Sequence, residues 1–152
     1  NTPRWGCGIG SPILPSPTEM KEKIRVVGAV IFDPDTESYF VGQRSKLKKH
    51  PLKWEFIGGK VENEDVLSAT EREFEEEVGV KIKATKLLKT LEYDYGGEIG
   101  MIEINFVECE KLPGGVKFDK SVYKTCQWVR RNALLDLDWI EADRLFVKSL
   151  LK

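Results

Sequence analysis

The sequence predicts an α/β (α+β) domain in which helices pack on the faces of a central mixed β-sheet. Three observations lead to this fold class. The chain has 152 residues, enough for one domain with an ordinary hydrophobic core. Apolar runs rich in β-branched and aromatic residues recur along it, as they do in strands. Only two long segments have the composition of a helix, and this combination favours a mixed sheet covered by helices.

The strands are expected in five regions of the chain. Residues 24–32 form an apolar run, residues 33–37 ("DPDTE") form a turn, and residues 38–44 return as the second strand of a hairpin. Residues 54–62 ("WEFIGGKVE") are a short strand with a glycine bend. The remaining strands are expected at 81–93, 101–109 and 126–129.

Two segments are expected to be helices. Residues 66–78 contain neither proline nor glycine, and Gly79 ends the helix. The buried stripe of this helix follows the spacing i, i+3, i+7, i+11 and consists of Leu67, Thr70, Phe74 and Val78. Residues 138–151 form a closing amphipathic helix.

The first 20 residues differ in composition from the rest. Residues 1–19 carry four prolines and three glycines, which is typical of an extended or mobile arm, and this arm could dock on a protein partner. Residues 21–152 are expected to form a single domain, as a monomer or a homodimer.

Composition bounds the compartment and the partners. The three cysteines form no CxxC pair, so we expect free thiols in a reducing compartment and a cytoplasmic protein. Import into an organelle stays open, because the chain begins at Asn1 rather than Met. Neither a transmembrane run of about 20 apolar residues nor a secretory signal is recognisable, so no membrane partner is expected.

Charge is unevenly distributed although the formal net charge is only −1. That total does not suggest wholesale electrostatic binding to nucleic acid. Residues 44–53 are basic, however, and residues 62–77 are strongly acidic. An acidic site beside a basic approach suits a metal ion and a polyanionic substrate. A solvated surface explains the basic run, taken alone, equally well.

The acidic helix carries glutamates where they repel one another. Glu73, Glu76 and Glu77 share one face, and each like-charge pair at this spacing costs a few tenths of a kcal/mol. A solvated face does not account for such clustering. A divalent cation does, because Mg²⁺ takes carboxylate oxygens, phosphates and waters as ligands. Glu75 points elsewhere.

The whole segment around these glutamates has a fixed pattern. It reads Gly58, five residues, Glu64, seven residues, Arg72-Glu73-Phe74, one residue, Glu76-Glu77, one residue, Gly79-Val80. This resembles the signature box of the Nudix hydrolases, with every fixed position occupied. Residue frequencies of roughly 6–7% give seven such matches a chance probability on the order of 10⁻⁸ per start position. The resemblance to the MutT-like branch extends over residues 24–151.

The resemblance implies a fold and an activity. The fold would be a Nudix α/β/α sandwich whose central mixed sheet adjoins the metal-binding helix. With Mg²⁺ or Mn²⁺, such an enzyme would cleave a (deoxy)nucleoside triphosphate to a monophosphate and pyrophosphate, and an oxidised nucleotide such as 8-oxo-dGTP is one candidate. Two alternatives remain: hydrolysis at an RNA 5′ end held by the 44–53 basic loop, and a non-catalytic nucleotide- or RNA-binding subunit of an RNA-processing assembly.

The resemblance also implies roles for the box residues. The metal ligands would be Glu73, Glu76 and Glu77 with a backbone carbonyl of Gly58 or Gly59. Arg72 would hold the glutamates in place by charge-assisted hydrogen bonds.

Three residues outside the helix are candidates for substrate binding. Arg44 ends a predicted strand and either contacts a phosphate or is a surface arginine. Asp143 matches the position from which MutT-like proteins hydrogen-bond the base, or else it is an acid favoured by a helix N-terminus. Lys60, which follows the glycine pair, is the third candidate.

The chain departs from the family pattern in three places. The segment "GGKVENED" is one residue shorter than in relatives, and Ile57 replaces the usual proline. Val122 occupies a position where MutT-like relatives often carry a glutamate. The general base is therefore expected to be either Glu76 or the nearby Asp119.

Overall fold

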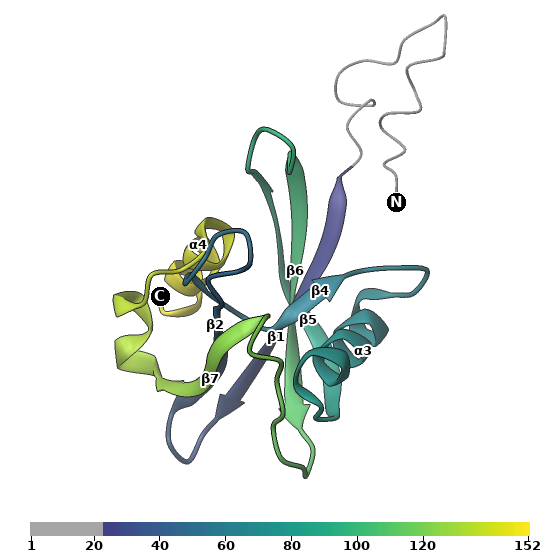
Figure 1. The fold of residues 1–152 in the computed structure, drawn as a ribbon. Helices are drawn as coiled ribbons and strands as arrows, with labels where there is room; N and C mark the ends of the chain where they lie inside the picture. Colours follow the sequence, from purple (N-terminus) through teal and green to yellow (C-terminus); the bar gives the residue numbers. More distant parts are fainter. Residues whose placement is uncertain (1–22) are drawn as a thin grey trace, which may run out of the picture.

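The computed structural model describes residues 23–152 and contains seven strands, two α-helices and one 3-10 helix (Figure 1). The expected arm, residues 1–20, lies outside the described residues. The elements in chain order are β1 (Ile24–Asp33), β2 (Ser38–Arg44), β3 (Trp54–Glu55), β4 (Gly58–Lys60), α3 (Val66–Val78), β5 (Ile82–Asp94), β6 (Met101–Lys111), β7 (Tyr123–Arg130), η2 (Arg131–Asp136) and α4 (Glu141–Leu150).

The strands form one mixed sheet with β1 at its centre. The order is β3-β2-β1-β6-β5, while β4 pairs with β1 and β7 pairs with β2. β1 runs parallel to β6 and antiparallel to β2 and β4. The mixed sheet expected from the sequence is therefore confirmed, and the parallel pairing of β1 with β6 is what makes it mixed.

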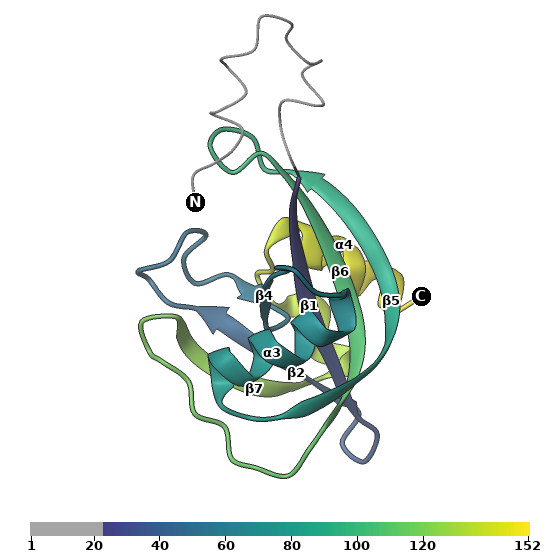
Figure 2. The same ribbon diagram turned by 90° about the vertical axis from the view of Figure 1, so that its right-hand side faces the viewer.

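The sheet is buried on both faces. Alternate residues of a strand point to opposite faces. In β1, Ala29 and Ile31 pack in the core cluster that contains Phe74 of α3, whereas Val30 packs in the cluster that contains Phe146 of α4. Figures 1 and 2 show the two helices on opposite sides of the strands. The α/β/α layers implied by the resemblance are confirmed.

Helix α3 begins and ends with caps that its sequence provides. The Asp65 carboxylate accepts a hydrogen bond from the Ser68 N–H at 2.8 Å. Gly79 adopts a left-handed conformation, with φ 70°, that favours glycine. Phe74 and Val78 are fully buried, as the expected stripe requires. The caps and the stripe together fix which face of the helix is exposed.

The structure differs from the expected elements at residues 54–62 and at the start of the last helix. Residues 54–62 form two short strands, because Glu55 pairs with β2 whereas Gly58–Lys60 pairs with β1. The closing helix begins at Glu141 rather than at 138. Trp139 is extended there, bridging to Trp54, and its buried Nε1–H donates to the Leu134 carbonyl at 2.7 Å. The 3-10 helix η2 was not expected.

No helix within residues 23–152 combines the length and the apolar character that crossing a membrane requires.

Candidate active site

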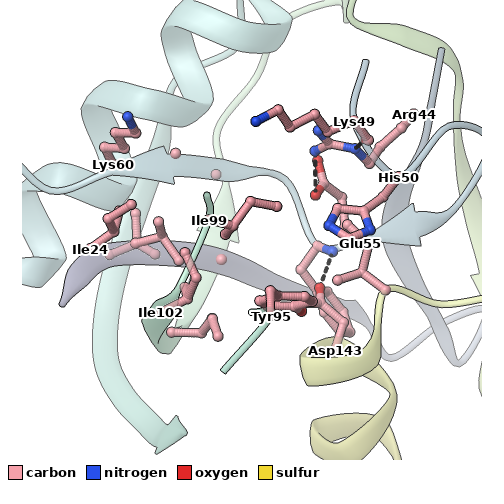
Figure 3. Close-up of a pocket in the computed structure, with 18 of the residues that line it drawn as sticks. Ile24, Arg44, Lys49, His50, Glu55, Lys60, Tyr95, Ile99, Ile102 and Asp143 are labelled. Carbon is pink, nitrogen blue, oxygen red and sulfur yellow. Dashed lines mark hydrogen bonds and ion pairs between the residues drawn. The ribbon is translucent and has the colours of Figure 1, made fainter. Parts of the chain in front are cut away.

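A cavity of about 410 Å³ opens beside β4, between the start of β1, the 45–53 loop, the β5–β6 hairpin and the start of α4 (Figure 3). The residues that line it are polar at one end and apolar at the other. Arg44, Glu55 and Asp143 lie at a polar end, whereas Ile24 and Ile102 form an apolar end. A cavity of this size, mostly apolar with a few polar groups, is typical of a small-molecule site.

The two glycines of β4 serve different purposes in the wall of this cavity. A Cβ at Gly58 would lie 1.8 Å from the carbonyl oxygen of Val27, so the backbone of β1 excludes any side chain there. A Cβ at Gly59 would lie 2.0 Å from Oε1 of Glu73. Gly59 thus allows the Glu73 carboxylate to lie directly against the strand. Of the two expected backbone ligands, Gly59 is the one beside this carboxylate.

Arg72 ties the box carboxylates together. Its Nε donates to Glu64 at 3.0 Å, and its Nη1 donates to Glu73 at 2.8 Å and to Glu76 at 3.3 Å. Nη2 donates to the Lys60 carbonyl of β4 at 3.0 Å. The hydrogen bond to Glu64 is the main cause that raises the pKa of Arg72 and lowers that of Glu64. Glu64, which the sequence left without a role, is therefore the principal anchor of Arg72.

The third glutamate, Glu77, lies at the C-terminal end of the same helix face. Burial raises the pKa of the Glu77 carboxyl, and the charge of Glu73 raises it further. Within residues 23–152, no group of three or more His, Cys, Asp or Glu side chains is arranged as a metal-binding cluster. Arg72 instead occupies hydrogen-bonding positions on Glu73 and Glu76.

The donor set nevertheless fits a hard divalent cation. The glutamates offer oxygen ligands of the kind that Mg²⁺ and Mn²⁺ prefer. Gly59 leaves room for Glu73 at the strand. Burial raises the pKa of Glu77 and the charge of Glu73 adds to this, and a bound cation would favour the charged form of both carboxylates. These residues could therefore hold Mg²⁺ or Mn²⁺.

Asp143 is buried at the polar end of the cavity. Its side chain turns inward from the first turn of α4, and Oδ2 accepts a hydrogen bond from the Phe56 N–H at 2.8 Å. The residue is only 7% exposed. Burial raises the pKa of Asp143 well above its usual value, and the charge of Glu55 adds to this. Asp143 thus presents a carboxyl group to the cavity, as base binding would require.

The other two candidates for substrate binding also line the cavity. Arg44 donates from Nε to the Lys49 carbonyl at 2.7 Å and from Nη1 to Glu55 at 3.0 Å. Lys60 lies near the apolar end and is exposed (Figure 3). The structure thus brings Arg44, Lys60 and Asp143 to one cavity.

Asp119 lies elsewhere, in the turn before β7. Its carboxylate accepts hydrogen bonds from the N–H and the hydroxyl of Ser121, at 2.8 and 2.7 Å, and these bonds lower its pKa. It is exposed and is not among the residues that line the cavity. Val122 is partly buried against the core, and its carbonyl accepts from the Ser45 N–H. The role of Asp119 as a base stays a prediction.

Glu55, His50 and Tyr95 also line the cavity, and the sequence alone assigned them no role there. Glu55 bonds Arg44, and the rings of His50 and Tyr95 meet at 5.2 Å between centroids. The Tyr95 hydroxyl accepts from the Ala142 N–H at 3.1 Å, which joins the hairpin to α4. Glu55 follows a tryptophan in a predicted strand, a weak local signal, whereas no local pattern relates positions 50 and 95.

Comparison with known proteins shows that this protein is an enzyme of the class that hydrolyses phosphoanhydride bonds. The NUDIX domain model matches residues 22–150, and the chain therefore belongs to the NUDIX family, in its MutT-like branch. Family members generally use divalent metals.

Individual relatives agree with this assignment. An 8-oxo-dGTP diphosphatase of Proteus vulgaris is 39% identical over 77 residues, which cover 49% of this chain and 67% of that protein. A MutT NUDIX hydrolase from Burkholderia pseudomallei has the same fold, with a TM-score of 0.74 at 20% identity, covering 84% of this chain and 98% of that one. A MutT protein from Methanosarcina mazei has a TM-score of 0.73 at 20% identity, covering 85% of this chain and 93% of that one.

Replacing Gly59 by alanine should weaken the binding of Mn²⁺. The new Cβ would overlap the Glu73 carboxylate, a side chain that can swing away but would then leave the strand. We expect the Mn²⁺ dissociation constant of Gly59→Ala, measured by calorimetry, to rise at least about tenfold. Gly115→Ala is the matched control, because a Cβ there meets nothing within 4 Å. Equal Mn²⁺ affinity in both variants would contradict the site.

Asp143 should make the fold less stable as pH rises. The unfolded chain releases the proton near pH 3.8, whereas the buried carboxyl keeps it to a much higher pH. Since the folded state then binds the extra proton, stability falls by up to about 1.4 kcal/mol per pH unit between the two pKa values. In urea unfolding at pH 4, 5.5 and 7, the stability of Asp143→Asn relative to the natural chain should therefore increase with pH. A constant difference would show that Asp143 ionises normally.

Proposed function

We propose that this chain is a Mg²⁺- or Mn²⁺-dependent pyrophosphohydrolase that cleaves a (deoxy)nucleoside triphosphate to a monophosphate and pyrophosphate. An oxidised purine nucleotide such as 8-oxo-dGTP is the substrate we would test first, because a 39%-identical relative is an 8-oxo-dGTP diphosphatase. One observation supports the proposal above the others. A single cavity has a buried carboxyl at its polar end and is bounded along one side by β4, the glycine strand against which the Glu73 carboxylate of α3 lies.

The cavity suits a nucleoside, and its rim suits phosphates. The rings of Phe56 and Tyr95 and the isoleucines of its apolar end offer surfaces for a base and a sugar. Asp143, held by the Phe56 N–H, offers its remaining carboxyl oxygen to a polar edge of the base. Arg44 and Lys60 supply positive charge for phosphate oxygens. The phosphates would then extend toward α3.

The chain's carboxylates can carry the proton of the reaction. A water oxygen forms a bond to phosphorus, the anhydride P–O bond breaks, pyrophosphate leaves, and the water proton passes to a base. A divalent cation, when bound, neutralises phosphate charge and makes a bound water more acidic. Glu76 is the best candidate for the base, because its side chain is 58% exposed and its contacts with Arg72 are long, at 3.3 and 3.4 Å. Glu73 is held more closely, at 2.8 Å.

A substrate panel tests the proposal directly. The chain is incubated with Mg²⁺ or Mn²⁺ and with nucleoside triphosphates, 8-oxo-dGTP and a 5′-triphosphorylated RNA, and phosphate and pyrophosphate are measured separately. Pyrophosphate from at least one mononucleotide is the expected result. Release from RNA alone would favour the RNA 5′ end, for which Lys49 at the cavity supplies a cation. No release from any of them would refute the enzymatic proposal.

The choice of Glu76 over its neighbour gives a sharper prediction. Glu76→Gln should lower kcat on the order of 10²- to 10⁴-fold, because it removes the proposed proton acceptor and preserves the shape of the side chain. Glu75→Gln, an exposed position on the same helix, should leave kcat unchanged. Pre-steady-state pyrophosphate release is the measurement. Similar kcat values for the two variants would exclude Glu76 as the base and leave Asp119 as the alternative candidate.

A further inference from the structure

A continuous set of hydrogen-bonded side chains lies behind the polar end of the cavity and joins three strands. The hydroxyl of Tyr123, on β7, donates to Oε2 of Glu55 at 2.9 Å. The other carboxylate oxygen of Glu55, on β3, accepts from Nη1 of Arg44 at 3.0 Å. Arg44, at the end of β2, also donates from Nε to the Lys49 carbonyl at 2.7 Å. Both Glu55 oxygens and two Arg44 nitrogens are thus committed.

The Tyr123 end of this set is firmly anchored. Tyr123 is 1% exposed, and its ring fills the space above Gly42, where a Cβ would lie only 2.8 Å from the ring. The ladder between β2 and β7 changes register between Gln43 and Arg44, next to this contact. Burial, and then the Glu55 charge, raise the pKa of Tyr123, so its hydroxyl stays protonated and donates. Glu55 therefore has a fixed support on the side away from the cavity.

The Arg44 end faces the cavity. Arg44 and Glu55 both line it (Figure 3). Tyr123 is not among the lining residues. Within residues 23–152, Nη2 of Arg44 donates no hydrogen bond to the protein. An arginine side chain loses rotamer entropy when it is immobilised on binding, and a guanidinium that is already held loses less of it.

We propose that Glu55 is a positioning residue: held by Tyr123, it fixes the guanidinium of Arg44 so that Nη2 is presented to a substrate phosphate. This rests on the proposed function, in which Arg44 binds a phosphate of the nucleotide. Glu55 then acts only through Arg44. Neither the resemblance nor the comparisons assign a role to Glu55 or Tyr123.

A double-mutant cycle tests whether Glu55 acts through Arg44. The full chain and the variants Glu55→Gln, Arg44→Met and the double variant are titrated with a non-hydrolysable α,β-imido nucleoside triphosphate in the presence of Mg²⁺. We expect each single variant to weaken binding about tenfold, the usual effect of losing a hydrogen bond to a charged group. The double variant should bind no more weakly than Arg44→Met alone. If the two effects multiply, so that the double variant binds the analogue about a hundredfold more weakly than the natural chain, the proposal is overturned.

Two further variants separate positioning from general damage to the fold. Tyr123→Phe should weaken analogue binding in the same direction as Glu55→Gln, and it should have no effect when Arg44 is already methionine. This variant carries the test if Glu55→Gln does not fold. Glu110→Gln, an exposed carboxylate on β6, should bind like the natural chain. In steady-state kinetics, Glu55→Gln should raise KM more than it lowers kcat, whereas equal binding by Tyr123→Phe and the natural chain would contradict the proposal.

Failure of this inference is distinguishable from failure of the proposed function. If the natural chain binds the analogue but turns over no nucleoside triphosphate, the function is wrong and the cycle still decides the role of Glu55. If the natural chain does not bind the analogue, the phosphate contact of Arg44 is wrong, and the positioning role is refuted with it.

Discussion

The contact between Gly59 and Glu73 is the constraint on which the rest of the site depends. The carboxylate lies where any other residue at position 59 would place its Cβ. That close approach sets the distance between α3 and β4, and Arg72 fixes it further by bonding both Glu73 and the Lys60 carbonyl. Helix, strand and carboxylate are thereby held as one unit beside the cavity.

Arg72 explains how α3 tolerates several glutamates on one face. Repulsion between like charges one turn apart costs only a few tenths of a kcal/mol per pair on an exposed helix. Arg72 lies within hydrogen-bonding distance of Glu64, Glu73 and Glu76, which offsets that repulsion in the free protein. The packing of Phe74 in the core holds the helix in place whether or not a cation is bound. Arg72 therefore holds these carboxylates together in the free protein, and we propose that a bound cation would take over part of its contacts with them.

Sequence reasoning succeeded where the information is local. The stripe of α3, its end at Gly79 and the nearness of Arg72 to the glutamates follow from helical spacing, and the structure agrees. It also selected Arg44 and Asp143, although only by resemblance. The turn around Asp119 also has a local signal, an acid two residues before Ser121, but this signal was not used, and Asp119 was considered only as a candidate base.

The rest could not be found because it depends on contacts between distant segments. Glu55 meets Tyr123 across 68 residues of sequence, and His50 meets Tyr95 only because the 45–53 loop and a hairpin converge. The parallel pairing of β1 with β6 likewise leaves no periodic trace in either strand. The short 3-10 helix η2 and the late start of α4 follow from the burial of Trp139, which helical propensity does not reveal.

The central claim, that a divalent cation binds where Glu73 meets Gly59, is tested most directly by adding Mn²⁺ to isotopically labelled protein and following paramagnetic broadening of the amide resonances. The account predicts that broadening at low Mn²⁺ concentration centres on Gly59 and on residues 73–77 of α3, and that excess Mg²⁺ reverses it. Broadening centred on another region, or none below the level of non-specific binding, would contradict the account.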